Sequence, residues 1–238
     1  MTLRAALLAS ALALSATPAA PGCATDAMLV FDGSASMAEI GADATAPTRI
    51  AEARTALHRA MPQIAPFRRV GLLVYGPGGD RSCTGIDLRF APIPDASQAV
   101  TGAIDTLAPQ GLTPLAASVL AAAETLDYRG TPGIVVLVTD GNETCGGRPC
   151  ALGATLAAEG YDLTVHVIGF RVVYDPFSWN SPEAEGYDGT TVAKCLADRT
   201  GGMYVSTETV DELAAALRET LGCALIGRAP ARPATSAG

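Results

Sequence analysis

The stretch AMLVFDGSASMAEI, residues 27–40, determines how the rest of the chain is interpreted. Its first five residues form an uninterrupted apolar run, which is typical of a strand buried on both faces of a sheet. The run ends abruptly at Asp32, and two hydroxyl side chains follow at alternating positions, Ser34 and Ser36. A buried strand that stops at a carboxylate and then presents hydroxyl groups predicts a polar site at the end of that strand.

Strand-like and helix-like segments alternate along the rest of the chain. Apolar runs expected to form strands cover residues 27–31, 68–76, 85–92, 133–140, 162–170 and 203–207. Segments with helical patterns cover residues 49–64, 95–107, 113–126, 150–160, 192–200 and 210–222. Apolar strands that alternate with helices imply a largely parallel sheet with helices on both faces.

One pair of strands cannot be parallel. Only the turn GPGGDRS, residues 76–82, separates the strand at 68–76 from the strand at 85–92, whereas a parallel crossover needs a dozen residues or more. Pro92 and Pro94 end the second strand, and proline is confined to the edges of sheets. We therefore predict an α/β fold with a doubly wound, mostly parallel, Rossmann-like sheet, one antiparallel edge strand and helices on both faces.

Polar residues mark where several helices should begin. Asp95 is expected to cap the helix at 95–107, and Thr113 is expected to cap the next one. Thr209 and Glu212 have the spacing of a capping box for the last helix. The Pro- and Ala-rich residues 223–238 follow that helix and are expected to be a disordered tail.

Residues 1–20 are expected to be a secretory signal peptide. Arg4 supplies a positive start, AALLASALALSA an apolar stretch, and TPAAPGC small residues for cleavage. The apolar stretch is too short to span a bilayer, and its lack of an amphipathic pattern disfavours a core helix. A lipid anchor on Cys23 is a further alternative, which Ala20 disfavours because leucine is usual there. The mature chain is thus expected to be periplasmic or secreted, with no transmembrane segment.

The cysteines gain meaning from the expected export. An even number of cysteines in an exported chain predicts disulfides, and six allow 15 pairings. Zinc is disfavoured because the chain has two histidines and no C-x2-C pair. The expected topology favours three pairs, which are Cys23–Cys223, Cys150–Cys195 and Cys83–Cys145. The local pair Cys145–Cys150 is the main rival.

The two most apolar strands both end at an acid, Asp32 and Asp140. Central strands are the most apolar, so these strands are expected to be neighbours, and ligands bind beyond the carboxyl ends of such strands. Two unshielded carboxylates would repel each other, and a cation between them removes the repulsion. Ser34, Ser36 and Thr113 add neutral oxygens on the same side. Ligands of this kind select Mg²⁺, Mn²⁺ or Ca²⁺, with Mg²⁺ favoured because it keeps part of its hydration shell.

The overall charge excludes some classes of partner. A formal net charge of −8 argues against nucleic acid as a partner, because nucleic acid would be repelled.

A serine hydrolase finds no support, because there is no G-x-S-x-G motif and no histidine near a candidate nucleophile. We therefore expect a protein that is not an enzyme.

Three motifs resemble those of von Willebrand factor type A domains. Residues 32–36 look like that family's D-x-S-x-S motif, GLTPLAAS (residues 111–118) like its second metal-site segment, and VVLVTDGNET (residues 135–144) like its third. The resemblance covers residues 24–222, and TCGGRPC and AKCLADRTGGMYV are similar to exported bacterial members. It implies a metal-ion-dependent adhesion site in which a partner's carboxylate completes the coordination. The ligands implied, directly or through water, are Asp32, Ser34, Ser36, Thr113 and Asp140.

A long loop, residues 171–190, follows a strand directed at the expected metal site. Its aromatic side chains, above all Tyr174, Phe177 and Trp179, would either anchor a partner or pack onto their own domain. Asn142 and Glu143 are interpreted as turn and rim residues rather than ligands.

The function expected from the sequence is metal-dependent adhesion or protein–protein interaction through an acidic residue of the partner. Two alternatives stay open. One is a metal-dependent hydrolase with a metal-activated water, for which no general base is evident. The other is a structural envelope protein whose metal only ties loops together.

Overall fold

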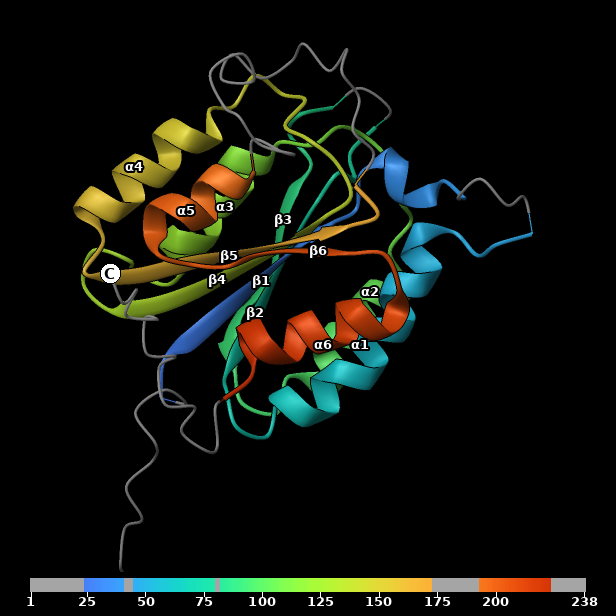
Figure 1. Cartoon of the computed structure of the whole chain (residues 1–238), viewed down its shortest axis with the longest axis horizontal. Coiled ribbons are helices and arrows are strands. Elements are labelled where there is room, and N and C mark those ends of the chain that lie inside the picture. Colours follow the sequence, from blue (N-terminus) through green and yellow to red (C-terminus); the bar gives the residue numbers. More distant parts are fainter. Residues whose placement is uncertain (1–23, 41–44, 80–81, 173–192, 224–238) are drawn as a thin grey trace, which may run out of the picture.

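The computed structural model describes residues 24–40, 45–79, 82–172 and 193–223. One sheet of six strands runs through them in the order β3-β2-β1-β4-β5-β6 (Figure 1). The strands are β1 (Asp26–Asp32), β2 (Val70–Tyr75), β3 (Ile86–Ile93), β4 (Pro132–Thr139), β5 (Asp162–Phe170) and β6 (Tyr204–Thr207). All neighbours are parallel except β2 and β3, which are antiparallel. This confirms the predicted sheet and its antiparallel edge strand.

Helices cover both faces of the sheet (Figure 1). The helices are α1 (Arg49–Ile64), α2 (Ser97–Asp105), α3 (Leu115–Thr125), α4 (Pro149–Glu159), α5 (Lys194–Thr200) and α6 (Val210–Leu221), with a 3₁₀ turn, η2 (Ala35–Ala38), after β1. Helices α1, α2 and α6 pack on one face, and α3, α4 and α5 on the other.

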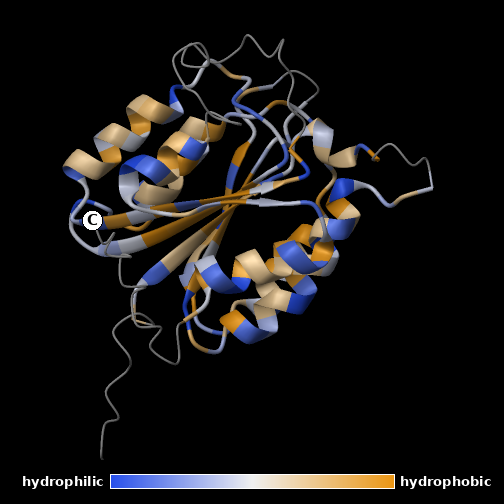
Figure 2. Ribbon diagram, in the orientation of Figure 1, coloured by the Kyte–Doolittle hydropathy of each residue, from blue (hydrophilic) through white to orange (hydrophobic). Residues whose placement is uncertain are grey.

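The central strand β1 supplies both cores. Leu29 and Phe31 point to the layer of α1 and α6, whereas Met28 and Val30 point to the layer of α3. Successive residues of a strand face opposite sides, so a strand covered on both faces must be apolar throughout. In Figure 2 the strongest hydrophobic colours run along the central strands, and hydrophilic residues are frequent on α1 and α6.

Two predicted helix caps are wrong. Asp95 has a left-handed φ of 51° in the turn before α2, and Ala96 occupies the cap position instead. Thr113 precedes Pro114, which is the residue at the cap of α3 and makes no side-chain capping bond. The amide of Ala116 bonds to the distant carboxylate of Glu143, so that donor is satisfied without a local cap. The capping box at the start of α6 is confirmed.

Two disulfides join cysteines that both lie within the described ranges, and both are pairs that the sequence analysis favoured. Cys150–Cys195 joins α4 to α5, and Cys83–Cys145 joins the loop after β2 to the loop after β4. The third expected pair involves Cys23, which lies outside the described residues, as do Tyr174, Phe177 and Trp179. No helix within the described ranges is both long and apolar enough to cross a membrane.

We expect Leu29→Ala in β1 to lower the free energy of unfolding by about 2–5 kcal/mol, because Leu29 is fully buried and its truncation leaves a cavity. The matched control is Leu88→Ala in the edge strand, where Leu88 is 47% exposed, and we expect it to cost less than about 1 kcal/mol. Guanidinium unfolding with the disulfides intact measures both. Equal losses would contradict the placement of β1 at the centre of the sheet.

Candidate metal centre

The carboxyl ends of β1 and β4 bring two acids together. The two strands are parallel neighbours, and Phe31 pairs with Val138, so Asp32 and Asp140 leave the sheet side by side. Both are buried, with exposed fractions of 0% and 2%. This is the arrangement that the two apolar strands predicted.

Asp32 is held by donors on each of its oxygens. Its Oδ1 accepts the amide of Ser34 at 2.8 Å, and its Oδ2 accepts the hydroxyl of Thr139 at 2.8 Å. The buried hydroxyl of Tyr75, at the end of β2, donates in turn to Thr139. Three neighbouring strands therefore fix the orientation of this one carboxylate.

Asp140 is joined to the serine pair. Ser36 donates its hydroxyl to Asp140 Oδ1 at 2.7 Å, and the Ser34 and Ser36 hydroxyl oxygens lie 3.0 Å apart. The structure thus links four of the five expected ligands through hydrogen bonds, in the order Asp32, Ser34, Ser36, Asp140. Because two carboxylates and two hydroxyls converge here, the cluster is rich in oxygen acceptors.

Thr113 lies on an adjoining loop and is 5% exposed. Its backbone is fixed by Thr144, whose hydroxyl accepts the Thr113 amide at 2.8 Å and whose amide donates to the Thr113 carbonyl at 3.1 Å. The preceding residues lie against the loop after β1, because Ala35 donates its amide to the carbonyl of Gly111. The loop of Thr113 therefore adjoins the serine pair, although no described hydrogen bond joins its hydroxyl to the other four side chains.

Glu143 is a buried brace rather than a rim residue, which corrects the sequence interpretation. It is 1% exposed, and its carboxylate accepts the amides of Ala116 and Cys145 at 2.9 and 2.7 Å. It ties the loop after β4 to the start of α3, next to the Cys83–Cys145 disulfide. The sequence feature that could have indicated this role of Glu143 is Pro114. A helix that begins at a proline without a local cap needs a hydrogen-bond acceptor from elsewhere in the chain.

The charge of Asp32 affects the titration of two neighbouring groups, Asp140 and Tyr75. Burial, followed by the charge of Asp32, raises the pKa of Asp140 to about 7, although the Ser36 hydroxyl and Arg49 oppose this rise. Burial and then the charge of Asp32 also raise the pKa of Tyr75. A cation between the acids would relieve this strain, because it favours the charged form of both.

The donor set suits a hard cation. The cluster offers carboxylate and hydroxyl oxygens and no sulfur or imidazole nitrogen, a choice that favours Mg²⁺, Mn²⁺ or Ca²⁺. In the described part of the chain, no group of three or more His, Cys, Asp or Glu side chains could hold a metal ion. The fit therefore depends on two carboxylates assisted by hydroxyls.

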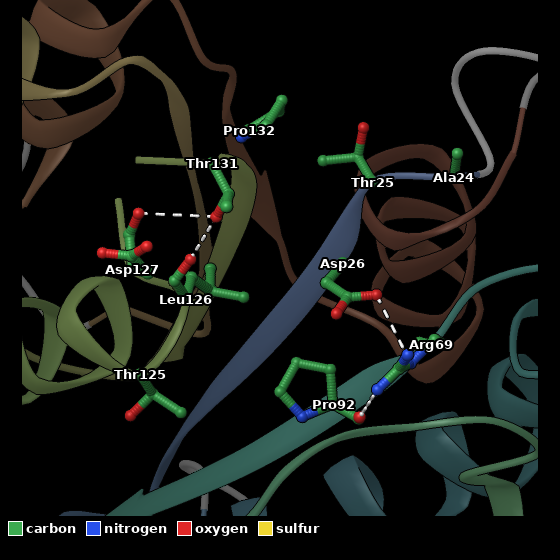
Figure 3. Close-up of a pocket in the computed structure, with 10 residues that line it drawn as sticks. All are labelled: Ala24, Thr25, Asp26, Arg69, Pro92, Thr125, Leu126, Asp127, Thr131 and Pro132. Atoms are coloured by element: carbon green, nitrogen blue, oxygen red, sulfur yellow. Dashed lines mark hydrogen bonds and ion pairs between the residues drawn. The ribbon is translucent and has the colours of Figure 1, made fainter. Parts of the chain in front are cut away.

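A separate cavity of about 600 Å³ lies at the other end of the sheet, where β1 and β4 begin (Figure 3). Three of its polar side chains, those of Asp26, Arg69 and Thr131, already have partners within its lining. Asp26 pairs with Arg69 at 3.5 Å, and Arg69 also donates to the carbonyl of Pro92. Thr131 donates to the carbonyl of Leu126. Because these groups are already bonded, the cavity is a weaker candidate for an ion-binding site than the carboxylate cluster.

We expect the metal-free protein to lose a few kcal/mol of stability as the pH rises from about 4 to about 7. Folded Asp140 keeps its proton to about pH 7, whereas an ordinary aspartate loses it near 3.8. Between these values the folded state binds more protons than the unfolded state, so raising the pH favours unfolding. Urea unfolding in EDTA measures this, and Asp140→Asn should remove it. The same slope in the variant would show that other groups cause it.

Comparison with known proteins supports one family. Residues 27–143 match the model of the von Willebrand factor type A domain. The uncharacterized protein YwmD of Bacillus subtilis is 26% identical over 197 residues, which cover 79% of this chain and 81% of that protein.

Solved structures share the fold at low identity. An aerotolerance-related membrane protein from Bacteroides fragilis has a TM-score of 0.59 at 18% identity, covering 83% of this chain and 98% of its own. The pilus adhesin SpaC from Lactobacillus rhamnosus GG has a TM-score of 0.62 at 16% identity, over 83% of this chain and 30% of its own. A third structure is that of proximal thread matrix protein 1 from the mussel byssus, with a zinc-occupied MIDAS motif. It has a TM-score of 0.54 at 18% identity, and the alignment covers 84% of this chain and 46% of that chain.

The residues matched by the family model contain both Asp32 and Asp140. The family model supports the von Willebrand factor type A domain as the family of this chain, and the solved structures share its fold.

Proposed function

We propose that this chain is an exported von Willebrand factor type A domain that binds a divalent cation, preferably Mg²⁺, and thereby holds an acidic group of a protein partner. In this proposal the domain spans residues 24–222, behind a signal peptide at 1–20 and before a tail at 223–238. The cation is held, directly or through water, by Asp32, Ser34, Ser36, Thr113 and Asp140.

One observation carries the proposal: two almost fully buried carboxylates lie side by side, next to hydroxyl oxygens. Burying two like charges is costly unless an opposite charge compensates for them. Proteins with a similar fold support the kind of function, because one is a pilus adhesin and another holds zinc in a MIDAS motif. The two disulfides and the membrane-protein neighbour support a location outside the cytoplasm.

The chain's own residues prepare the site before any cation arrives. Asp32 is oriented by Ser34 and Thr139, and the Thr113 backbone by Thr144. A bound Mg²⁺ would supply a Lewis acid that attracts a carboxylate oxygen of the partner. Because these contacts fix the ligands in advance, little ordering is needed when a partner binds.

We expect titration calorimetry to show saturable Mg²⁺ binding to the EDTA-stripped protein, and Asp32→Ala or Asp140→Ala to abolish it because each removes a charged ligand. Asp162→Ala, at an exposed position at the start of β5, is the matched control and should bind like the wild type. Normal binding by either site variant would show that the ligands are assigned wrongly. Capture of partners in Mg²⁺ against EDTA then separates adhesion from a metal that only raises the melting temperature.

The two disulfides offer a second test, because they close loops of similar length, 62 and 45 residues. Replacing either pair by alanine should lower stability by about 4 kcal/mol through chain entropy. Only loss of Cys83–Cys145 should weaken Mg²⁺ binding, since Cys145 follows the residues that position Thr113. Calorimetry on both double variants, with circular dichroism to check folding, decides this. Equal weakening would indicate a general loss of order.

A further inference from the structure

Arg49 is a buried cation beside the carboxylate cluster. It is the first residue of α1 and only 6% exposed. Its Nη1 reaches Asp140 Oδ2 at 3.2 Å, the carbonyl of Ser36 at 2.9 Å and Glu39 Oε2 at 3.1 Å. One guanidinium nitrogen thus connects the turn after β1 with the acid after β4.

This position is unfavourable for an arginine in two respects. A cation at the N-terminus of a helix opposes the helix dipole. In addition, the Nε of Arg49 is buried and has no hydrogen-bond partner within the described residues, which carries a desolvation cost. The attraction of Asp140 offsets these costs, so the reason for a cation here lies in the carboxylate cluster and not in the helix.

The charges near the site explain what Arg49 does. With both acids ionised, as a bound cation favours, Asp32 and Asp140 carry −2 and Arg49 carries +1, which gives −1 before the charge of the cation is added. Glu39, which also pairs with Arg49, is 65% exposed and screened by solvent, and the Glu143 carboxylate accepts the amides of Ala116 and Cys145. A bound divalent cation changes the net charge from −1 to +1, which suits one carboxylate. Without Arg49 the loaded cluster would be neutral.

We propose that Arg49 is a specificity-determining residue of the site: a resident counter-cation that holds the cluster together when it is empty and gives the loaded cluster a positive charge that selects a carboxylate. This inference rests on the proposed function. Arg49 is bound to Oδ2 of Asp140, whereas Oδ1 faces the serine hydroxyls. The two roles of Asp140 therefore use different oxygens, and Arg49 stays in place when a cation binds.

The proposal makes opposite predictions for the cation and for the anion. Removing a positive charge close to Asp140 strengthens the attraction of Mg²⁺, so we expect Arg49→Gln to bind Mg²⁺ about 10-fold more tightly in calorimetry. The same variant should bind acetate about 10-fold more weakly when loaded with Mn²⁺, measured by the water-proton relaxation of the ion. Arg49→Lys keeps the charge and should stay within about threefold of the wild type in both measurements.

Arg54→Gln is the matched control. Arg54 lies on the same helix, and its described bonds are to the carbonyls of Ile104 and Leu107. Its loss should therefore lower stability but change neither the Mg²⁺ affinity nor the acetate affinity. If Arg49→Gln binds Mg²⁺ equally or more weakly than the wild type, or leaves acetate affinity unchanged, the role of Arg49 is wrong. If the wild type and Arg54→Gln also fail to bind Mg²⁺, the proposed function fails with it.

Discussion

The parallel pairing of β1 with β4 is the constraint on which the site depends. It forces Asp32 and Asp140 to leave the sheet at adjacent positions, where both are almost completely buried. A charged carboxylate is costly in such a place, and two are costlier. The surrounding groups therefore act as donors or opposite charges: an amide from Ser34, hydroxyls from Ser36 and Thr139, and the guanidinium of Arg49.

A second layer of contacts holds this arrangement in place. Glu143 and Thr144 connect the loop after β4 to the loop before α3, and Cys83–Cys145 adds a covalent link to the loop after β2. None of these residues is needed as a ligand. They matter because loops at the end of a sheet are otherwise its least ordered part, and a site with ligands from three loops needs all three fixed.

Much of the fold could be predicted from local sequence. Apolar runs located the strands, and the short turn at 76–82 required the antiparallel edge. The high apolarity of β1 and β4 predicted that they are central neighbours. The capping box at Thr209 was also readable, because both of its partners lie within one helical turn.

Features that depend on distant partners could not be predicted in this way. Thr113 has the sequence pattern of a helix cap. It is not one, because Glu143, 27 residues away, accepts the amide of Ala116 instead. Arg49 meets Asp140 across 91 residues. On the sequence it is one charged residue at the start of an amphipathic helix, which is the usual position of a solvated side chain. Only the folded sheet shows it as part of the site.

The strand order has a consequence for how the chain must fold. The first strand in sequence, β1, occupies the middle of the sheet, and one of its two neighbours, β4, begins only at Pro132. A growing chain therefore carries an apolar strand with one bare hydrogen-bonding edge until β4 has emerged, and exposed edges of this kind invite association with other chains. Closing that edge requires contacts between residues far apart in sequence, which slows folding. A nascent chain of this protein thus depends on protection from aggregation until its second half has been made.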